Sequence, residues 1–213
     1  MNAVAPIWSD SMSDFEGNRY STIVADPPWP YAGAGPVGAG GRGYNNEAIQ
    51  VSASDRYELM PIGEIEGLLP ISLLDDNAHL YLWTSNSFMD EAYDVARAWG
   101  FVPKTIITWV KVMADIPSSP SMKAGYYFRG ATEHCLFGVR GSLPLQTERA
   151  IATAFLHPRL PHSVKPPSFM DMVEECSPAP RLEVFCRSAR PGWHAFGNQI
   201  EHANNTASIW DQP

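Results

Sequence analysis

The sequence of 213 residues has few cysteines and no long apolar run. Its longest uninterrupted apolar stretches contain only a few residues, far fewer than the roughly 20 that cross a bilayer. Three acidic residues among the first sixteen argue against a signal peptide. The three cysteines form no Cys-x-x-Cys pair, which argues against a zinc site and a disulfide framework. We therefore expect a cytoplasmic chain that uses no metal and contacts no membrane.

The composition, 45% apolar and 18% charged, is sufficient for one compact domain over residues 1–213. The net charge of -8 disfavours nucleic-acid binding by the chain as a whole, but residues 100–165 carry eight basic and only three acidic side chains. This basic segment predicts either one face for phosphate groups or a solvated surface of unrelated charges. Its basic residues are Lys104, Lys111, Lys123, Arg129, Arg140, Arg149, Arg159 and Lys165.

Segments typical of strands alternate with segments typical of helices, and this alternation predicts an α/β domain. One predicted helix has an N-cap at Ser85 or Ser87 and ends at Gly100. Another opens at Pro167 and Ser168 and is ended by Pro178 and Pro180, and its apolar face consists of Phe169, Met172, Val173 and Cys176. The predicted strands cover residues 21–25, 78–83, 105–110, 133–139, 151–155, 181–185 and 192–197.

Two long loops separate these elements, one at residues 31–43 with six glycines and one at residues 114–130. Loops of more than about 12 to 15 residues in a compact domain are usually functional or disordered. Both loops follow strand ends, where α/β sheets bind their ligands, so we expect them to be mobile substrate loops. Residues 1–18 form an N-terminal segment, and residues 204–213 form a polar tail that is expected to fray.

Residues 33–38 match the Gly-x-Gly-x-x-Gly pattern of dinucleotide-binding proteins. That pattern binds pyrophosphate only where a strand turns directly into a helix. Here two prolines separate the pattern from the preceding strand, Pro36 interrupts it, and no amphipathic helix follows. Because Gly-Lys-Ser/Thr is also absent, the sequence predicts neither a nicotinamide site nor a P-loop.

The tetrad Asp26-Pro27-Pro28-Trp29 ends a buried strand with a rigid turn. The exocyclic amine of adenine is a poor nucleophile because its lone pair is delocalised into the ring. The Asp26 carboxylate and the Pro27 carbonyl can accept both amine hydrogens and favour a pyramidal nitrogen, while Trp29 stacks on the base. The alternative interpretation is a buried Asp26 that caps a turn, with Trp29 in the core.

The chain resembles the DPPW-type N6-adenine methyltransferases of the MT-A70 family over residues 23–202. The resemblance depends on seven motifs that occur in the family's order. They are Asp26-Pro27-Pro28-Trp29, Leu80-Tyr81-Leu82-Trp83, Ile107-Thr108-Trp109-Val110-Lys111, Glu133-His134-Cys135-Leu136-Phe137-Gly138, His162-Ser163-Val164-Lys165-Pro166, Glu183-Val184-Phe185 with Arg187, and residues 193–199 ending in Gly197-Asn198-Gln199.

The resemblance implies a Rossmann-like class I methyltransferase domain with a mostly parallel central sheet, helices on both faces and a permuted motif order. It implies S-adenosylmethionine as cofactor, with Asp26-Pro27-Pro28-Trp29 as the catalytic residues. The implied cofactor-binding residues are Asp26, Lys165, Phe185, Arg187, Asn198 and Gln199, of which Lys165 binds the methionine carboxylate. The implied substrate-binding residues are Trp29, Tyr57, Trp83, Trp109, Lys111 and Glu133.

The sequence departs from its relatives where they carry a His-Asn pair after the arginine. This chain has Ser188-Ala189-Arg190 there, so Ser188 or Arg190 is expected to replace part of that cofactor contact. The resemblance implies methylation of adenine in nucleic acid, with DNA favoured over RNA, by a monomer or homodimer that can have a partner subunit. The alternatives are a catalytically silent subunit that binds nucleic acid or supports a partner, and methylation of another planar amine.

Overall fold

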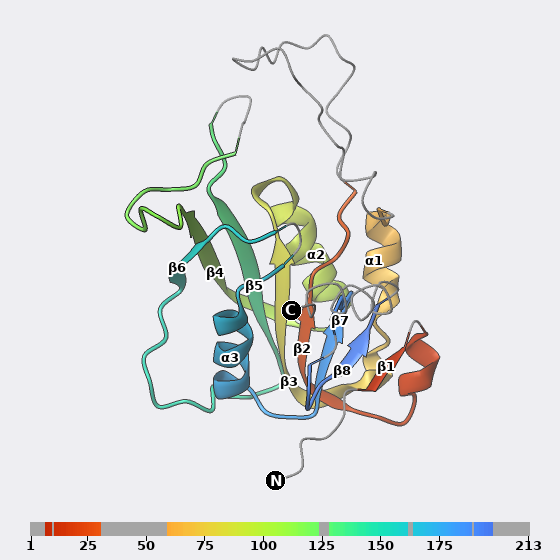
Figure 1. The fold of residues 1–213 in the computed structure, drawn as a ribbon. Helices are drawn as coiled ribbons and strands as arrows, with labels where there is room; N and C mark the ends of the chain where they lie inside the picture. Colours follow the sequence, from red (N-terminus) through yellow and green to blue (C-terminus); the bar gives the residue numbers. More distant parts are fainter. Residues whose placement is uncertain are drawn as a thin grey trace, which may run out of the picture.

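The computed structural model describes residues 7–9, 11–30, 59–123, 128–161, 164–188 and 190–197, which form an eight-stranded sheet covered by helices (Figure 1). The order of the strands in the sheet is β1-β8-β7-β2-β3-β5-β4-β6. The strands are β1 (Ile7–Ser9), β2 (Tyr20–Ala25), β3 (Leu74–Thr84), β4 (Val102–Val112), β5 (Thr132–Arg140), β6 (Ala154–Pro158), β7 (Arg181–Val184) and β8 (His194–Phe196). The helices are η1 (Met12–Phe15), α1 (Ile62–Leu68), η3 (Ile71–Leu73), η4 (Asn86–Phe88), α2 (Met89–Ala98) and α3 (Pro167–Cys176).

The sheet is mostly parallel, as predicted. β2 runs parallel to β3 and β7, β8 runs parallel to β7 and β1, and β6 runs parallel to β4. β5 alone is antiparallel to its two neighbours, β3 and β4. The prediction of a Rossmann-like α/β fold is therefore confirmed.

Helices cover both faces of the sheet. Successive side chains of a strand point to opposite faces, so one strand can pack against helices on both sides. On β3, Leu80 and Leu82 pack in the cluster that contains residues of α1 and α2. Tyr81 and Trp83 pack on the other face, in the cluster that contains Phe169 of α3. Figure 1 shows α3 on one side of the sheet and α1 and α2 on the other. Each face therefore has its own hydrophobic core.

One edge of the sheet gathers the residues of interest. The parallel strands β2, β3 and β4 have their carboxyl ends there, and the antiparallel strand β5 begins there. Every residue of β2 is buried, and its ladder ends where Pro27 and Pro28 follow Asp26. Asp26, Lys111 near the end of β4 and Glu133 near the start of β5 therefore share this edge, where α/β sheets bind ligands.

Several boundaries differ from the sequence predictions. The strand predicted at 151–155 lies at Ala154–Pro158, next to β4. The N-terminal segment contains the short strand β1 and η1, and α1 was not predicted because its seven residues bury only Ile65. Ser85 makes no side-chain capping hydrogen bond, and it precedes η4 rather than α2 itself. At the other end, Gly100 follows α2 with a φ of 81°, as predicted for the residue that stops this helix.

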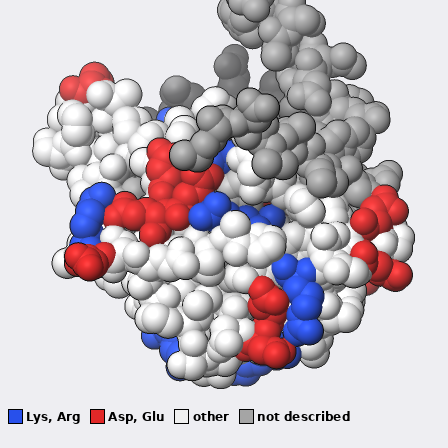
Figure 2. Space-filling model, turned by 90° about the horizontal axis from the view of Figure 1, so that it is seen from below, with Lys and Arg blue, Asp and Glu red and all other residues white. Residues whose placement is uncertain are grey.

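The basic segment at residues 100–165 does not form one face, which corrects one of the two interpretations. Lys104 and Lys111 lie near opposite ends of the eleven-residue strand β4. Lys111 and Lys165 form ion pairs with low exposure to solvent, and Arg149 pairs with Glu175 on α3. On the face shown in Figure 2, Lys and Arg side chains lie in small groups beside Asp and Glu.

In the described part of the chain, no helix is long and apolar enough to cross a membrane. The same residues contain no group of three His, Cys, Asp or Glu side chains that could hold a metal ion. Cys135, Cys176 and Cys186 are all free and buried.

Candidate active site

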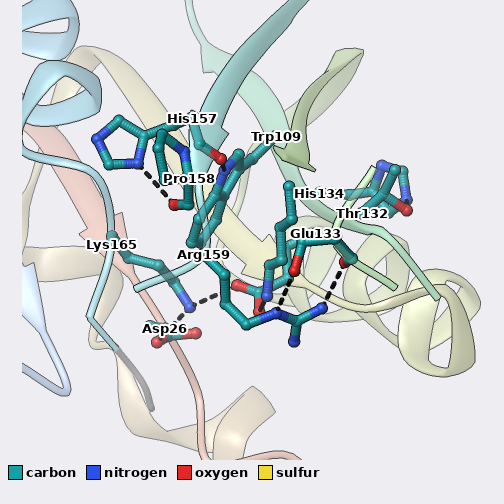
Figure 3. Close-up of polar contacts among 11 residues, drawn as sticks. Asp26, Trp109, Thr132, Glu133, His134, His157, Pro158, Arg159 and Lys165 are labelled. Atoms are coloured by element: carbon teal, nitrogen blue, oxygen red, sulfur yellow. Dashed lines mark hydrogen bonds and ion pairs between the residues drawn. The ribbon is translucent and has the colours of Figure 1, made fainter. Parts of the chain in front are cut away.

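Four charged side chains of alternating sign form a chain of ion pairs at the carboxyl edge of the sheet. The ammonium group of Lys165 lies 2.8 Å from Asp26 Oδ2 and 3.1 Å from Glu133 Oε2. Glu133 Oε1 also pairs with the ammonium group of Lys111. Figure 3 shows Lys165 directed toward both carboxylates. The fold therefore brings together Asp26, Lys111, Glu133 and Lys165, which the sequence analysis assigned to three different roles.

Each of these residues has a position that local structure determines. Asp26 directly follows β2, and Lys165 lies two residues before α3, which begins with Pro167 at its first position. Lys111 and Glu133 come from the paired strands β4 and β5, whose register places Trp109 opposite Glu133. The ammonium group of Lys111 also lies 4.5 Å from the ring centroid of Trp109. That of Lys165 lies 4.9 Å from the ring centroid of Trp83.

In this site the ion pairs together shift the pKa values of Lys165 and Glu133 more than burial does. Burial lowers the pKa of Lys165, but the carboxylates of Asp26 and Glu133 raise it well above its ordinary value. Burial likewise raises the pKa of Glu133, but Lys165 and Lys111 lower it below its ordinary value. Both groups are therefore charged at neutral pH, and Lys165 is a fixed cation beside two anions.

A cavity of about 370 Å³ opens beside Asp26 and Lys165. This volume falls within the range of about 300 to 1,000 Å³ that is usual for small-molecule sites. Although Asp26 is ion-paired, both it and Lys165 line the cavity, so the pair faces open space rather than the core. The lining residues are Val24, Asp26, Trp83, Val164, Lys165, Pro167, Met170, Glu183, Phe185, Arg187, Ser188, Arg190 and Pro191.

A group that carries both a carboxylate and an ammonium fits this end of the cavity. Lys165 can bind the carboxylate and Asp26 can bind the ammonium, so that each charge of the existing pair gains a partner of opposite sign. The amino-acid end of S-adenosylmethionine is such a group. Phe185 and Arg187, which the resemblance also implies as cofactor contacts, line the same cavity.

The turn after β2 differs from the prediction at Trp29. Its side chain is only 2% exposed, stacks on Phe88 and donates a hydrogen bond of 3.0 Å to the Trp83 carbonyl. The prediction that Trp29 stacks on a base is therefore wrong for this conformation, and the alternative core interpretation describes it. The Pro27 carbonyl accepts a hydrogen bond from the Trp29 N–H at 2.9 Å, which leaves one of its lone pairs for a ligand.

The other two tryptophans of the predicted site are also buried. Trp83 lines the cavity and packs against Phe169 of α3. Trp109 donates a hydrogen bond to the His157 carbonyl and forms an edge contact with Trp83. Trp83 therefore lines the cavity, whereas Trp109 lies in the core and contacts Trp83. Three further predicted residues, Tyr57, Asn198 and Gln199, lie outside the described residues, as do residues 31–43.

The sequence analysis did not predict a role for Glu183, which lines the cavity at the end of β7. Burial, with a smaller contribution from the charge of Asp26, raises the pKa of Glu183 to about 7. Glu183 alternates along β7 with two buried apolar residues, Leu182 and Val184. Only its position inside the matched Glu-Val-Phe motif could have indicated the site.

Comparison with known proteins identifies the family of this chain. The profile of the MT-A70 family matches residues 20–199, which include both ends of the ion-paired chain. The chain belongs to the MT-A70 family. The family resemblance inferred from the seven motifs is therefore confirmed.

Relatives in the family differ in how much of their length this chain covers. It is 27% identical to the type II methyltransferase M.MunI of Mycoplasma sp over 85% of this chain and 78% of that protein. It is 24% identical to the human N(6)-adenosine-methyltransferase catalytic subunit METTL3 over 86% of this chain, but spans only 28% of METTL3. It is also 27% identical to the non-catalytic subunit METTL14 of Xenopus tropicalis over 66% of this chain and 33% of METTL14.

Proposed function

We propose that this protein transfers a methyl group from S-adenosylmethionine to the N6 amine of adenine in nucleic acid. The observation that carries the proposal is the Asp26–Lys165 pair at 2.8 Å, which lines a cavity in a member of the MT-A70 family. Relatives named as N6-adenosine methyltransferases support the reaction.

The charges of Lys165 and Asp26 indicate where the amino-acid end of the cofactor would bind. Lys165 holds the methionine carboxylate, and Asp26 accepts hydrogen bonds from the methionine ammonium. Phe185 and Arg187 line the same cavity, and we expect the nucleoside part of the cofactor to lie beside them. When bound there, S-adenosylmethionine supplies an electrophilic methyl group.

Asp26 also prepares the substrate amine. Its carboxylate and the remaining lone pair of the Pro27 carbonyl accept the two amine hydrogens, so that the nitrogen lone pair is free of the ring. As the nitrogen gains positive charge, the fixed negative charge of Asp26 stabilises it. Asp26 or water then takes the proton that the nitrogen loses. Lys165 holds Asp26 in place throughout through their ion pair, and Glu133 in turn pairs with Lys165.

We propose DNA ahead of RNA as the substrate. The support is that the chain covers 78% of the Mycoplasma type II methyltransferase and only 28% of the human adenosine methyltransferase subunit. The described loop residues Lys123 and Arg129, both exposed and close in sequence to the ends of β4 and β5, are candidates for phosphate contacts. The cytoplasmic location and the monomeric or homodimeric state remain predictions from the sequence.

Asp26→Asn tests the proposal, because it keeps the shape of the side chain and removes its charge. We expect the rate of methyl transfer to fall by about 10² to 10³, as for the loss of one preorganised electrostatic partner. The readout is mass spectrometry of nucleosides from DNA and RNA after incubation with isotope-labelled S-adenosylmethionine. Circular dichroism is expected to show an unchanged fold, and Asp94→Asn on the exposed face of α2 is the matched control.

Three outcomes would contradict parts of the proposal. A wild-type rate in Asp26→Asn would remove Asp26 from the reaction. Methylated cytosine instead of N6-methyladenine would favour the planar-amine alternative. A wild-type protein that binds nucleic acid but neither binds S-adenosylmethionine in calorimetry nor transfers a methyl group would favour the silent-subunit alternative.

A further inference from the structure

Residues 185–188 and 190–191 contribute one wall of the cavity, and we call these residues the strap. It contributes Phe185, Arg187, Ser188, Arg190 and Pro191 to the cavity lining. At its start, Phe185 has a φ of 65°, a left-handed conformation that is uncommon for a residue with a side chain. Such conformations persist only where the surrounding structure holds them, and they cluster at functional sites.

The start of the strap is held by the sheet. The Cys186 N–H donates a hydrogen bond of 2.8 Å to the Phe196 carbonyl of β8. Gly197 follows β8 so closely beneath Cys186 that a Cβ atom there would overlap the Cys186 backbone. The Cys186 thiol donates to the Ser188 carbonyl at 3.0 Å, which shapes the next turn of the strap. The first half of the strap therefore has a backbone anchor.

The end of the strap is held by contacts of the Arg190 side chain. Its Nε atom lies 2.6 Å from Glu174 Oε1, and its Nη2 atom lies 2.6 Å from Asp171 Oδ1. Both carboxylates belong to α3. Trp193 Nε1 donates to the same Glu174 oxygen at 2.7 Å, and the Trp193 N–H donates to the Arg190 carbonyl at 3.1 Å.

Helix α3 forms the facing wall of the same cavity. Pro167 and Met170 of α3 line it, and Lys165 lies two residues before the helix begins. Arg190 therefore joins the strap to the helix that begins two residues after Lys165. Its planar guanidinium can hold two carboxylates at once, which a lysine ammonium at the same place would do with poorer geometry.

We propose that Arg190 is a positioning residue for the cofactor, which sets the separation of the strap from α3 by binding Asp171 and Glu174. This inference depends on the proposed use of S-adenosylmethionine at this cavity. Relatives have a His-Asn pair in this region, and the sequence analysis expected Ser188 or Arg190 to replace it in binding the cofactor. The two short contacts on α3 assign Arg190 to holding the cavity wall instead.

Arg190→Ala and Arg149→Ala form a matched pair of variants. Each removes an arginine that is paired with a carboxylate of α3, but Arg149 binds Glu175 and is absent from the cavity lining. We expect Arg190→Ala to raise the Kd for S-adenosylmethionine, measured by calorimetry, by about tenfold, as for the loss of charge-assisted hydrogen bonds. The KM for an adenine-containing oligonucleotide at saturating cofactor is expected to stay within about twofold of wild type.

Arg149→Ala is expected to change neither constant, and Arg190→Lys is expected to recover only part of the cofactor affinity. In a double-mutant cycle, Asp171→Asn should add little to Arg190→Ala, because the two residues act through the same contact. Unfolding in urea separates this effect from a general loss of stability, which would affect cofactor and oligonucleotide binding alike.

A cofactor Kd in Arg190→Ala within twofold of wild type would overturn the inference, as would equal loss of cofactor and oligonucleotide binding. Additive effects of Arg190→Ala and Asp171→Asn would also overturn it. These results differ from failure of the proposed function, in which the wild-type protein itself would not bind S-adenosylmethionine.

Discussion

Replacing Glu133 by glutamine removes the negative charge that lies between Lys111 and Lys165. The side chain of Lys111 is only 8% exposed, so the substitution leaves a poorly solvated ammonium group without a counter-ion. Removing one partner of a fully buried pair costs about 3 to 5 kcal/mol, whereas an exposed pair contributes about 0 to 1 kcal/mol. Glu133 is 27% exposed, so we expect a loss between these limits, about 2 kcal/mol at pH 7.

The pH dependence of this loss provides a second test. Burial opposes the charge of Glu133, but Lys165 and Lys111 hold its pKa below the ordinary value. A group whose pKa is lower in the folded state stabilises the fold above its unfolded-state pKa, here about 4.3. That contribution disappears as the pH falls through the folded-state pKa. The difference in free energy of unfolding between wild type and Glu133→Gln should therefore shrink as the pH falls below the unfolded-state pKa and toward the folded-state pKa.

Urea unfolding followed by tryptophan fluorescence at pH 7, 5 and 3.5 measures both effects. Thermal unfolding should show a Tm that is lower by about 4 to 8 °C at pH 7, given about 2 to 4 °C per kcal/mol for a chain of this size. Asp94→Asn is the control, because its partner Arg97 is 61% exposed and the pair should contribute less than about 0.5 kcal/mol. A deficit in Glu133→Gln no larger than that of the control, or one that does not become smaller between pH 5 and pH 3.5, would refute the reasoning.

Two further predictions concern the core around the site. Trp29→Phe keeps an aromatic ring but leaves the Trp83 carbonyl without its donor, so the free energy of unfolding in urea should fall by about 1 to 3 kcal/mol; no change would mean that this hydrogen bond is unimportant. Burial lowers the pKa of His79, although the Leu143 carbonyl partly opposes this, so the folded state favours the neutral imidazole. Since the unfolded-state pKa is about 6.5, His79 stabilises the fold above that pH and this contribution is lost as the pH falls toward the folded-state pKa. The urea midpoint should therefore fall less between pH 7 and pH 5 in His79→Gln than in wild type, and equal slopes would exclude His79 as the source.

Local patterns predicted much of the fold because they depend on neighbouring residues. The apolar, β-branched run before Asp26 predicted β2, and the two prolines after it predicted where its ladder ends. Pro167 and the apolar spacing after it predicted the start of α3 and the face that it buries. In contrast, only Ile65 of the seven residues of α1 is buried, and β1 has only three residues, so no periodicity indicates either element.

Aromatic residues show where sequence patterns are ambiguous. The tryptophan three residues after Asp26 is equally suited to stacking on a base and to filling a core, because both use the same apolar ring. Packing against Phe88 and the hydrogen bond to Trp83 place Trp29 in the core. Arg190 is ambiguous in the same way, since its place in the sequence does not show which carboxylates approach its guanidinium.

The sequence by itself determined the family, the mostly parallel sheet and the individual residues Asp26, Glu133 and Lys165, because motifs and periodicity are properties of short segments. Tertiary structure alone decided that these three side chains join Lys111 in one chain of ion pairs beside a cavity. Residues 26, 111, 133 and 165 lie far apart along the chain and meet only where strands β2, β4 and β5 and the segment before α3 reach one edge of the sheet. The energy of each pair depends on distance and burial, and both are set by packing rather than by any one segment.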